Sequence, residues 1–459
     1  MSETETRSMP DSARGGVRNS ASMIRGSLIS LGVRLLDLPS RYGFHLLVAA
    51  ALGVVETGNF YIVFSTMVAL AGFGRLGIDQ ALTRQIAMDV ASGRHSAVRP
   101  AIRRALGYVL LASLAVSAML VAGAVAFAEH VLNKPTLAVP LMLGALAFVP
   151  QNVGAVFAGA LAGLQRVGCS QMIYSWLWPA IFCVAAVPVV MTGAMTVTHA
   201  LLLIAASFAL AALTGAVLLK RFLDAVPKVG EQSHQPARLF KPGLSLFTLE
   251  FTKLLITSAP AIVLGIVASS RETGLFALAW RLALVVNLLI SGVTGMAAPR
   301  FASLFARRDQ EGLQRSAAQA TGIVLALAVP FTICMLLVPE HVLSIFGHGY
   351  GAGASALRVL AVGQLAAACF TAMPELLGMT AHASVLYRIN VGSVAVLLIG
   401  LAVMAPGGGS VGAAAAASLA VAVNGALAAW AARKLLGVFP LAVVWRGVCD
   451  RVRPRAAGR

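Results

Sequence analysis

Apolar segments recur along the whole chain and are separated by short stretches rich in Gly, Pro and charged residues. Each segment is about 20 residues long, which as a helix is enough to cross the hydrocarbon core of a bilayer. The pattern therefore predicts a polytopic bundle of helices, with span ends placed to within several residues. The predicted spans are 28–51, 57–81, 105–128, 137–161, 172–191, 198–219, 244–268, 274–298, 316–338, 355–378, 385–404 and 411–432.

Composition supports the same class. Hydrophobic residues make up 59% of the chain, charged residues only 11%, and the mean hydropathy is +0.86. A soluble protein carries about 25% charged residues. We therefore predict an all-α polytopic membrane protein with about 12 transmembrane helices. The five cysteines are scattered and form no C-x-x-C pair, which argues against a disulfide framework or a zinc site.

The basic residues are divided unequally between the two sides of this bundle. The net charge is +18, and 27 of the 35 Lys and Arg fall in the tails and in alternate connections, against 2 in the opposite connections. Positive residues stay on the cytoplasmic side, so both termini are expected inside. The basic charge thus reflects orientation and contact with anionic lipids, and nucleic-acid binding is not expected.

A pair of charges is repeated along the chain. Arg34 and Asp37 lie in the first span, and Glu250 and Lys253 lie in the seventh, 216 residues further on in both cases. The tripeptide Glu-Thr-Gly at 56–58 recurs at the same separation. This repeat indicates a duplicated protein, and because each half has six spans the halves run parallel, related by an axis along the membrane normal.

The domain organisation follows from the spans and the repeat. We expect a disordered cytoplasmic tail at 1–23, an N-terminal six-helix bundle at 24–220, a cytoplasmic linker at 221–242, a C-terminal six-helix bundle at 243–433 and a basic cytoplasmic tail at 434–459.

Charged residues inside the spans are the candidate functional residues. A charge in a bilayer costs about 2.5–3.5 kcal/mol on insertion scales, so such residues usually face an interior pathway. The first span contains four of them at steps of 3, 4 and 4 residues: Arg34, Asp37, Arg41 and His45. On a helix this spacing places the four side chains on one face, within an arc of about 80°. Arginine suits a diphosphate because its planar fork donates two parallel hydrogen bonds. The candidate substrate-binding residues are Arg34, Asp37, Arg41, His45, Glu250, Lys253 and Arg281.

Structural explanations remain open for these residues. Arg34 with Asp37, and Glu250 with Lys253, are alternatively ion pairs that lock helices together. His45 is equally well explained as a packed histidine or as a proton site. Near the span ends, snorkelling to the interface is the favoured interpretation. It applies to Arg75, Arg358 and Glu375.

Several motifs resemble those of a known family. They are L-G-x-x-E-T-G-x-F at 52–60, G-x-D-x-A-L-T-R-Q-I-A at 77–87 and I-F-G-x-x-Y at 345–350. In these stretches the chain resembles polysaccharide and oligosaccharide flippases of the multidrug/oligosaccharidyl-lipid/polysaccharide exporter superfamily, over roughly residues 25–432.

The resemblance implies two six-helix bundles around a central cationic cavity. It implies transport of an undecaprenyl-diphosphate-linked oligosaccharide across the bacterial inner membrane, with Arg34 and Arg41 contacting the diphosphate. Polysaccharide polymerases and glycosyltransferases are then the expected partners. Two features depart from the family pattern: the arginine usual before the L-G motif is replaced by alanines at 49–51, and twelve spans fit a repeat-unit flippase better than a lipid II flippase.

The functional hypothesis is a flippase, not an enzyme, serving the assembly of O-antigen, capsule or exopolysaccharide by alternating access. No cofactor is expected, since the chain has no phosphate-binding loop; coupling to H⁺, Na⁺ or the membrane potential stays open. A duplicated chain of this kind can work as a monomer. The alternative is a cation-coupled multidrug exporter, which requires an isolated titratable carboxylate, whereas Asp37 is flanked by arginines. A glycosyl-transfer enzyme is disfavoured by the short outer connections.

Overall fold

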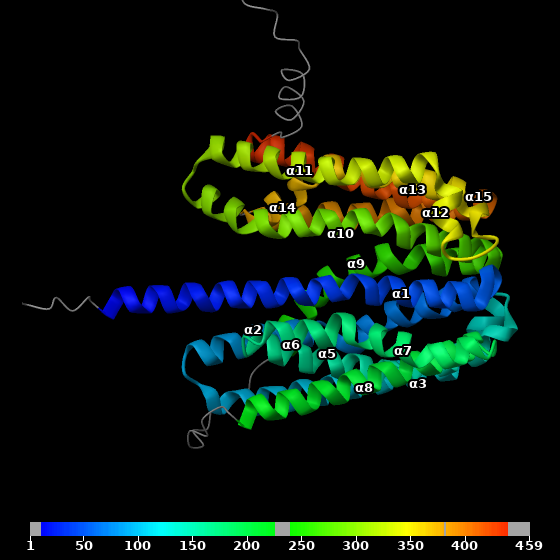
Figure 1. Ribbon diagram of the computed structural model, residues 1–459, viewed down its shortest axis with the longest axis horizontal. Helices are drawn as coiled ribbons and strands as arrows, with labels where there is room; N and C mark the ends of the chain where they lie inside the picture. Colours follow the sequence, from blue (N-terminus) through cyan, green and yellow to red (C-terminus); the bar gives the residue numbers. More distant parts are fainter. Residues whose placement is uncertain (1–10, 225–238, 381, 439–459) are drawn as a thin grey trace, which may run out of the picture.

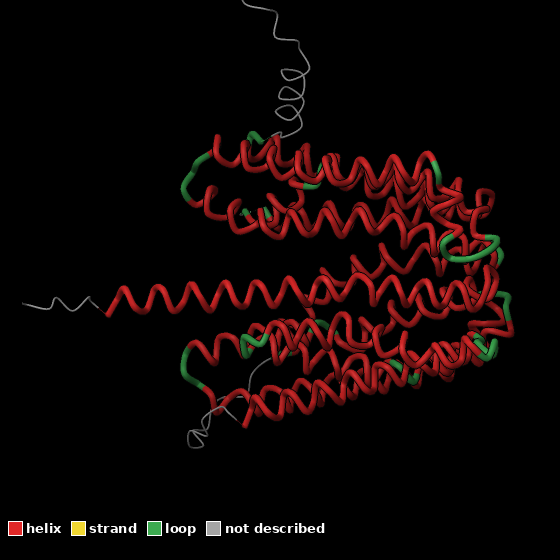
Figure 2. Tube along the Cα trace, viewed as in Figure 1, coloured by secondary structure: helices red, strands yellow, loops and turns green. Residues whose placement is uncertain are grey.

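The computed structural model describes the backbone of residues 11–224, 239–380 and 382–438, and side chains from residue 37 onward except at 245, 249, 288 and 289 within these ranges. The described chain is almost entirely helical and contains no strand (Figures 1 and 2). Within it, ten helices are long and apolar enough to cross a membrane. An all-α membrane fold was the expectation from sequence, and it is confirmed.

The first helix, α1 (Asp11–Arg75), folds back on itself. Its only non-helical residue is Gly53, with φ 72° and ψ 174°. The Tyr61 hydroxyl lies 2.7 Å from His45 Nδ1, although sixteen residues of straight helix would separate them by about 24 Å. The segments before and after Gly53 are therefore antiparallel, and α1 contains the first predicted span and most of the second, which was expected to continue to residue 81.

The last helix, α15 (Ala383–Leu436), does the same at Gly409, where φ is 52° and ψ is −131°. Across this fold-back Asn424 Nδ2 donates to Asn390 Oδ1 at 3.0 Å. Both turns were expected as short loops, at 52–56 and 405–410, but a single glycine with positive φ reverses the chain in each. Membrane crossing by all twelve segments stays a prediction.

The remaining helices follow the predicted order, and several are broken into shorter pieces. They are α2 (Ile78–Ala91), α3 (Val98–Ala126), α4 (Ala138–Ala145), α5 (Phe148–Gly163), α6 (Val167–Gln171), α7 (Leu177–Met191), α8 (Val197–Asp224), α9 (Phe240–Val267), α10 (Ser270–Ala306), α11 (Gln310–Leu337), α12 (Pro339–Ser344), α13 (Ala354–Cys369) and α14 (Ala372–Met379).

The N-terminal boundary differs from the expectation. Residues 11–23 were assigned to a disordered tail, but the backbone of this stretch continues α1 as helix. Once a helix is nucleated by an apolar span, each further residue adds one hydrogen bond, so polar flanking residues extend it. The rest of the predicted tail lies outside the described residues, as do 225–238 of the linker and 439–459 of the C-terminal tail.

The largest buried core shared by the two halves lies at one end, and at the other end they touch where the start of α9 packs on α1 and α2. One buried cluster combines residues of both halves, such as Phe44, Phe60, Phe276 and Tyr350. Two further clusters belong to single halves: one unites α2, α3 and α5, the other α10, α11 and α14. In Figure 1 the helices of the two halves correspondingly lie together at one end and spread apart at the other.

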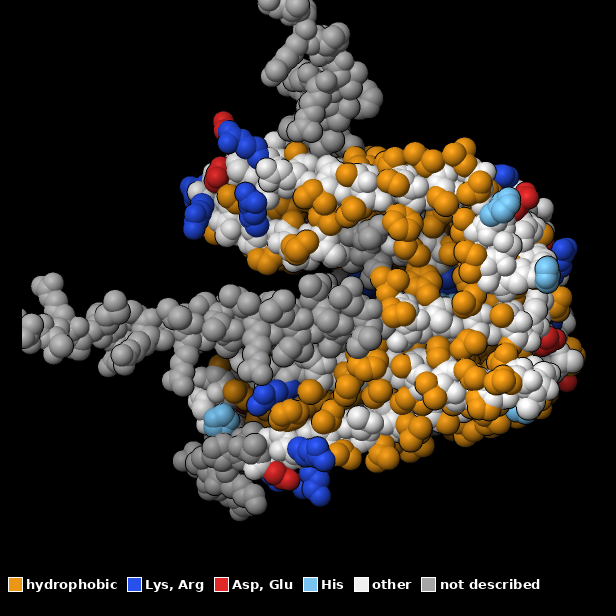
Figure 3. All heavy atoms as spheres, in the orientation of Figure 1, with side chains coloured by type: hydrophobic (Ala, Val, Ile, Leu, Met, Phe, Trp, Pro, Cys, Tyr) orange, Lys and Arg blue, Asp and Glu red, His pale blue; other side chains and the backbone are white. Residues whose placement is uncertain are grey.

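The ends also differ in charge. Basic side chains gather on the loops at the spread end, while few appear at the closed end (Figure 3). By the charge distribution in the sequence, the spread end is the one expected to face the cytoplasm. The closed end, which contains Gly53, Gly409 and the connections near Lys134 and Tyr350, is called the outer end below.

One break distinguishes the halves. The junction of α1 and α2 has positive φ at Leu76 (50°) and Gly77 (66°). A Cβ on Gly77 would overlap the backbone of Gly243 and Phe247 in α9, so only glycine fits there. The equivalent part of α10 is continuous helix through Ala306.

Candidate functional site

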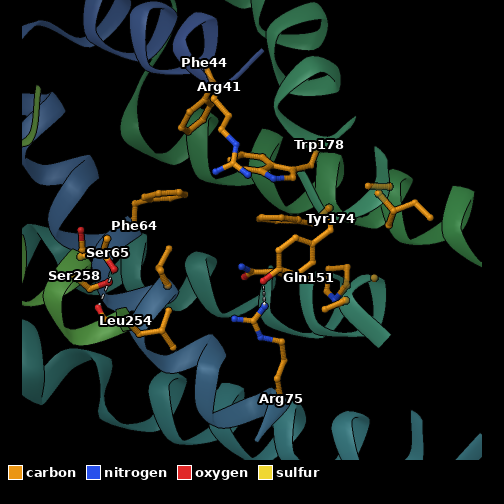
Figure 4. A pocket seen from close by; sticks show the side chains of 18 of the residues that line it. Arg41, Phe44, Phe64, Ser65, Arg75, Gln151, Tyr174, Trp178, Leu254 and Ser258 are labelled. Atoms are coloured by element: carbon orange, nitrogen blue, oxygen red, sulfur yellow. Dashed lines mark hydrogen bonds between the residues drawn. The ribbon is translucent and has the colours of Figure 1, made fainter. Parts of the chain in front are cut away.

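A cavity of about 270 Å³ lies between the halves. Its walls come from both segments of α1 and from α5, α7, α8, α9 and α10, together with the π-helical turn Met172–Trp176. Figure 4 shows Arg41 and Arg75 entering it from opposite sides, with Tyr174 and Trp178 between them. The ionisable side chains that line it are Arg41, His45, Arg75, Tyr174, Glu250 and Arg281.

Arg41 is held in a triangle of hydrogen bonds. Its Nε donates to Asp37 Oδ1 at 2.7 Å, one turn earlier on the same helix, and its Nη2 donates to Ser175 Oγ at 2.9 Å. The Ser175 hydroxyl in turn donates to Asp37 Oδ1 at 2.7 Å. The side chain of Arg41 remains 47% exposed, so the guanidinium is oriented by Asp37 and Ser175 yet open to the cavity.

Arg75 contributes the second guanidinium, although snorkelling to the interface is the interpretation that its place near a span end favours. The residue is only 8% exposed, and its Nη1 donates to the Tyr174 hydroxyl at 3.3 Å. It lines the cavity at the end of α1, and its side chain reaches the π-helical turn Met172–Trp176 and does not extend to the interface. Its position two residues before Gly77, a helix-breaking residue, was the available signal.

Arg281 on α10 contributes the third guanidinium. Its Nε is buried without a hydrogen-bond partner among the described residues, and its Cζ lies 5.5 Å from the centroid of the Tyr61 ring. Tyr61 also bonds His45, which explains His45 as a packed side chain at the cavity edge. A buried donor without a partner is costly, so the Nε of this guanidinium is available for an anionic group entering the cavity.

Glu250 is the single carboxylate of the lining. It accepts a long hydrogen bond of 3.4 Å from Gln80 Nε2. Lys253, three residues on, is exposed and does not line the cavity, and within the described residues no ion pair joins the two. Three guanidinium groups and one carboxylate thus line the cavity, and a second carboxylate, that of Asp37, lies directly behind Arg41.

The duplication is visible in the lining. Arg41 and Thr257 are equivalent by the 216-residue repeat, as are Ser65 and Arg281, and all four line the cavity. At each pair of equivalent positions, one half supplies an arginine and the other a hydroxyl. Equivalent positions of the two halves therefore line the cavity, but the charged residues at these positions differ between the halves.

The other predicted residues have mixed placements. Asp37 lies behind Arg41, outside the lining, and pairs with Arg41; the alternative pairing with Arg34 involves a side chain outside the described residues. Arg358 is exposed and donates to the Leu336 carbonyl at 3.3 Å, away from the cavity. Glu375 also lies outside the lining.

Aromatic side chains form much of the wall, and the sequence analysis missed them. Trp178 stacks on Phe208 at 4.7 Å between ring centroids and meets Phe44 edge-on at 5.2 Å. Phe64 and Tyr174 complete this group. An aromatic residue in an apolar span carries no sign of whether it faces lipid, core or cavity, so these residues could not be identified from the sequence.

Comparison with solved structures defines the class of this fold. A multidrug resistance MATE family transporter of the MOP superfamily, in an inward-facing conformation, superposes with a TM-score of 0.66 at 14% identity, covering 94% of this chain and 99% of its own. The lipid II flippase MurJ in an inward closed conformation gives 0.69 at 12% identity, with coverages of 92% and 89%. A multidrug resistance MATE family transporter in an outward-facing conformation superposes with a TM-score of 0.59 at 18% identity, covering 88% of this chain and 95% of its own.

The chain thus has the fold of MOP-superfamily transporters and is a multi-pass membrane protein. Residues 23–305 match the family described as "Polysaccharide biosynthesis protein", and the chain belongs to that family. Comparison with curated proteins found no match. The family resemblance found in the sequence motifs is confirmed.

Proposed function

We propose that this protein is a flippase that moves an undecaprenyl-diphosphate-linked oligosaccharide across the bacterial inner membrane for surface polysaccharide synthesis. One observation carries the proposal: Arg41, Arg75 and Arg281 converge on a single cavity between the halves, against one carboxylate. Membership of the polysaccharide biosynthesis family and the transporter fold support it.

The chemistry of the cavity fits a diphosphate headgroup. Guanidinium groups donate planar, parallel hydrogen bonds to phosphate oxygens, and each such charge-assisted bond is about twice as strong as a neutral one. Ser65 lies at the position equivalent to Arg281, where its hydroxyl is an additional donor. The hydroxyl of Thr257, equivalent to Arg41, donates to the Lys253 carbonyl of its own helix at 2.6 Å. Trp178, Tyr174 and Phe64 offer flat apolar surfaces for sugar rings.

The arrangement of the spread end and the outer end supports a path for the headgroup across the membrane. The spread end carries the basic loops, so in the proposed orientation both termini and the open side face the cytoplasm. A headgroup enters from the cytoplasmic leaflet, is neutralised by the arginines, and leaves when the halves rock so that the outer end opens. The polyprenyl tail stays in lipid along the seam between the halves.

In this proposal the chain is a transporter and not an enzyme. Its substrate is supplied by glycosyltransferases and consumed by a polysaccharide polymerase, which are the expected partners. Since the driving force does not come from a nucleotide site in this sequence, it comes from an ion gradient, the membrane potential or consumption of the product.

The test measures lipid-linked oligosaccharide in each leaflet of the inner membrane in a deletion strain. The strain is complemented in turn with the wild-type chain, Arg41→Ala and Arg358→Ala. Deletion and Arg41→Ala should both cause accumulation in the cytoplasmic leaflet, because the headgroup is no longer held in the cavity. Arg358→Ala is the matched control, since this exposed arginine also lies in a span but outside the cavity.

Unchanged lipid-linked oligosaccharide in the deletion strain, with no redundant flippase present, refutes the proposed function. Accumulation in the deletion strain together with full rescue by Arg41→Ala keeps the function but removes Arg41 from the substrate path. Expression of each variant is checked in the same membranes, so that loss of protein is distinguished from loss of transport.

A cation-coupled multidrug exporter is the second candidate, and Glu250 favours it. This carboxylate lines the cavity and makes no ion pair within the described residues, as a coupling site for H⁺ or Na⁺ requires. Asp37 is unsuited because it is engaged by Arg41 and Ser175. Loss of ion-coupled drug efflux in Glu250→Gln, with unchanged oligosaccharide in both leaflets, would favour this candidate over the flippase.

A further inference from the structure

Two hydrogen-bonded contacts join the halves at the outer end. Lys134 follows α3 in the N-terminal half, and its Nζ donates to the carbonyls of Gly265 and, at 3.1 Å, Ala268 at the end of α9. Tyr350 belongs to the C-terminal half, and its hydroxyl lies 2.9 Å from the carbonyl oxygen of Ala49 in α1. Each half therefore reaches across to a helix of the other.

The two contacts are equivalent by the internal repeat. Tyr350 lies 216 residues after Lys134, and Gly265 lies 216 residues after Ala49. The donor and the acceptor are thus both duplicated, although the donor is an ammonium in one copy and a phenol in the other. Chance placement of a single contact does not produce this correspondence.

Both donors engage the end of a helix. Ala49 is in the last turn of α1 before Gly53, and Gly265 is in the last turn of α9. The last four carbonyls of a helix lack intrahelical partners, and a positive group is favoured beside them. Burial lowers the pKa of the Lys134 ammonium below its ordinary value of 10.5, and the helix-end carbonyls are what stabilise the charge there. Tyr350 is 1% exposed and also bonds Thr57 Oγ1 at 2.8 Å.

Two glycines lie between these contacts and mark the axis of the repeat. A Cβ on Gly58 would overlap the Ser270 carbonyl, and a Cβ on Gly274 would overlap the Val54 carbonyl. Gly58 and Gly274 are equivalent by the repeat, as are Val54 and Ser270. The backbones of the halves therefore meet directly on the axis, with one cross-contact on each side of it.

We propose that Lys134 and Tyr350 are paired latches that hold the outer end closed, and that both release when this end opens. Separation of the halves at this end breaks both contacts, because each donor and its acceptor belong to different halves. The inference requires only that the halves separate at the outer end and is independent of which substrate is carried.

The latches differ in how they open. When Lys134 leaves the α9 carbonyls, its ammonium regains water, and the helix end is also solvated. When Tyr350 leaves, its hydroxyl and the Thr57 hydroxyl come out of a fully buried environment. A net hydrogen bond is worth about 0.5–1.5 kcal/mol between neutral groups and more with a charge, so loss of one latch is expected to raise the outer-open population about tenfold.

The experiment measures how fast a cavity cysteine is labelled from outside. The five native cysteines are replaced by alanine, and Ser65→Cys, in the cavity wall, is the reporter. Right-side-out vesicles are treated with a membrane-impermeant maleimide. The labelling rate is proportional to the outer-open population, so even a rare open state gives a measurable change.

Lys134→Met and Tyr350→Phe should each raise the labelling rate about tenfold, and the double variant about a hundredfold, because the two sites share no partner. Lys134→Arg keeps a cation and should stay near the parent rate. Arg271→Met and Tyr108→Phe are matched controls of the same chemical change, and they should not alter the rate.

Unchanged labelling in both latch variants overturns the proposal, as does an equal increase in the two control variants. Gel filtration of the purified variants reports whether each one folds. If Lys134→Met fails to fold, the labelling rate of Tyr350→Phe, which lacks only one oxygen atom, tests the proposal by itself. The labelling needs no substrate, so its result stands separately from the leaflet measurement that tests the flippase.

Discussion

The outer end and the cavity are both built from residues that the internal repeat makes equivalent, but the outer end is closely packed and the cavity is open. At the outer end the equivalent residues Gly58 and Gly274 bring two backbones together until no further atom fits. In the cavity the equivalent pairs Arg41 with Thr257 and Ser65 with Arg281 leave space, and the Nε of Arg281 has no hydrogen-bond partner among the described residues. The halves thus pack most closely where equivalent residues are identical, and the cavity carries its charges where equivalent residues differ.

The largest effect should come from Arg281→Gln. If the cavity binds a diphosphate headgroup, losing one charged hydrogen-bond donor costs about 1.5–3 kcal/mol, which weakens binding of undecaprenyl diphosphate about 10- to 100-fold. The thermal unfolding midpoint should change little, because the substitution removes both a buried donor without a partner and the contact of the guanidinium with the Tyr61 ring. Binding to purified protein and thermal unfolding in detergent measure both; a lowered midpoint with unchanged affinity would show that Arg281 is structural.

Gly58→Ala should produce the reverse result. The added methyl has to displace the Ser270 carbonyl on the axis, and such overpacking costs about 1–3 kcal/mol of stability. Affinity for the headgroup should change little, since Gly58 does not line the cavity. Gly123→Ala in α3 is the control: nothing lies within 4 Å of its Cβ, so there the helix should gain stability. Equal unfolding midpoints for the two variants would contradict the close approach at the axis.

The smallest effect should come from Ser175→Ala. This change removes the hydroxyl that bridges Asp37 and Arg41 but leaves their direct contact of 2.7 Å. A single hydrogen bond is worth about 1 kcal/mol, so headgroup affinity should fall about fivefold. Titration of undecaprenyl diphosphate into the purified Ser175→Ala variant measures this affinity. The same titration with Thr257→Ala, which removes the hydroxyl equivalent to Arg41, compares the contributions of the two halves. An undiminished affinity would show that Asp37 alone orients Arg41.

Much of the fold was predictable because its signals are strong in sequence. Long apolar runs define the helices, and the 216-residue repeat of Arg34–Asp37 and Glu-Thr-Gly reveals the duplication. The reversals at Gly53 and Gly409 were less predictable, since one residue with positive φ replaces an expected loop. Whether a glycine reverses a chain or only packs closely depends on what the following segment contacts, and those contacts are distant in sequence.

The candidate site was predictable only in part. Arg41, His45, Glu250 and Arg281 were chosen because charges are rare in apolar spans, and all four line the cavity. Lys253 satisfied the same criterion but lies just beyond the stripe formed by Glu250, Leu254, Thr257 and Ser258 on α9. The period of a helix orders residues around it but does not fix which arc meets the partner, and neutral lining residues such as Tyr174 and Trp178 carry no charge to reveal them.

The break between α1 and α2 makes the two halves mechanically unlike. α10 is one helix of 37 residues, about 55 Å long, without a break at the equivalent positions, so a tilt at its outer end is transmitted to its other end. The equivalent path in the N-terminal half is jointed at Leu76 and Gly77, directly after Arg75, and this joint rests on the start of α9. In a rocking motion α10 would therefore move as one rigid helix. The equivalent helices of the N-terminal half would bend at Leu76 and Gly77, beside the cavity.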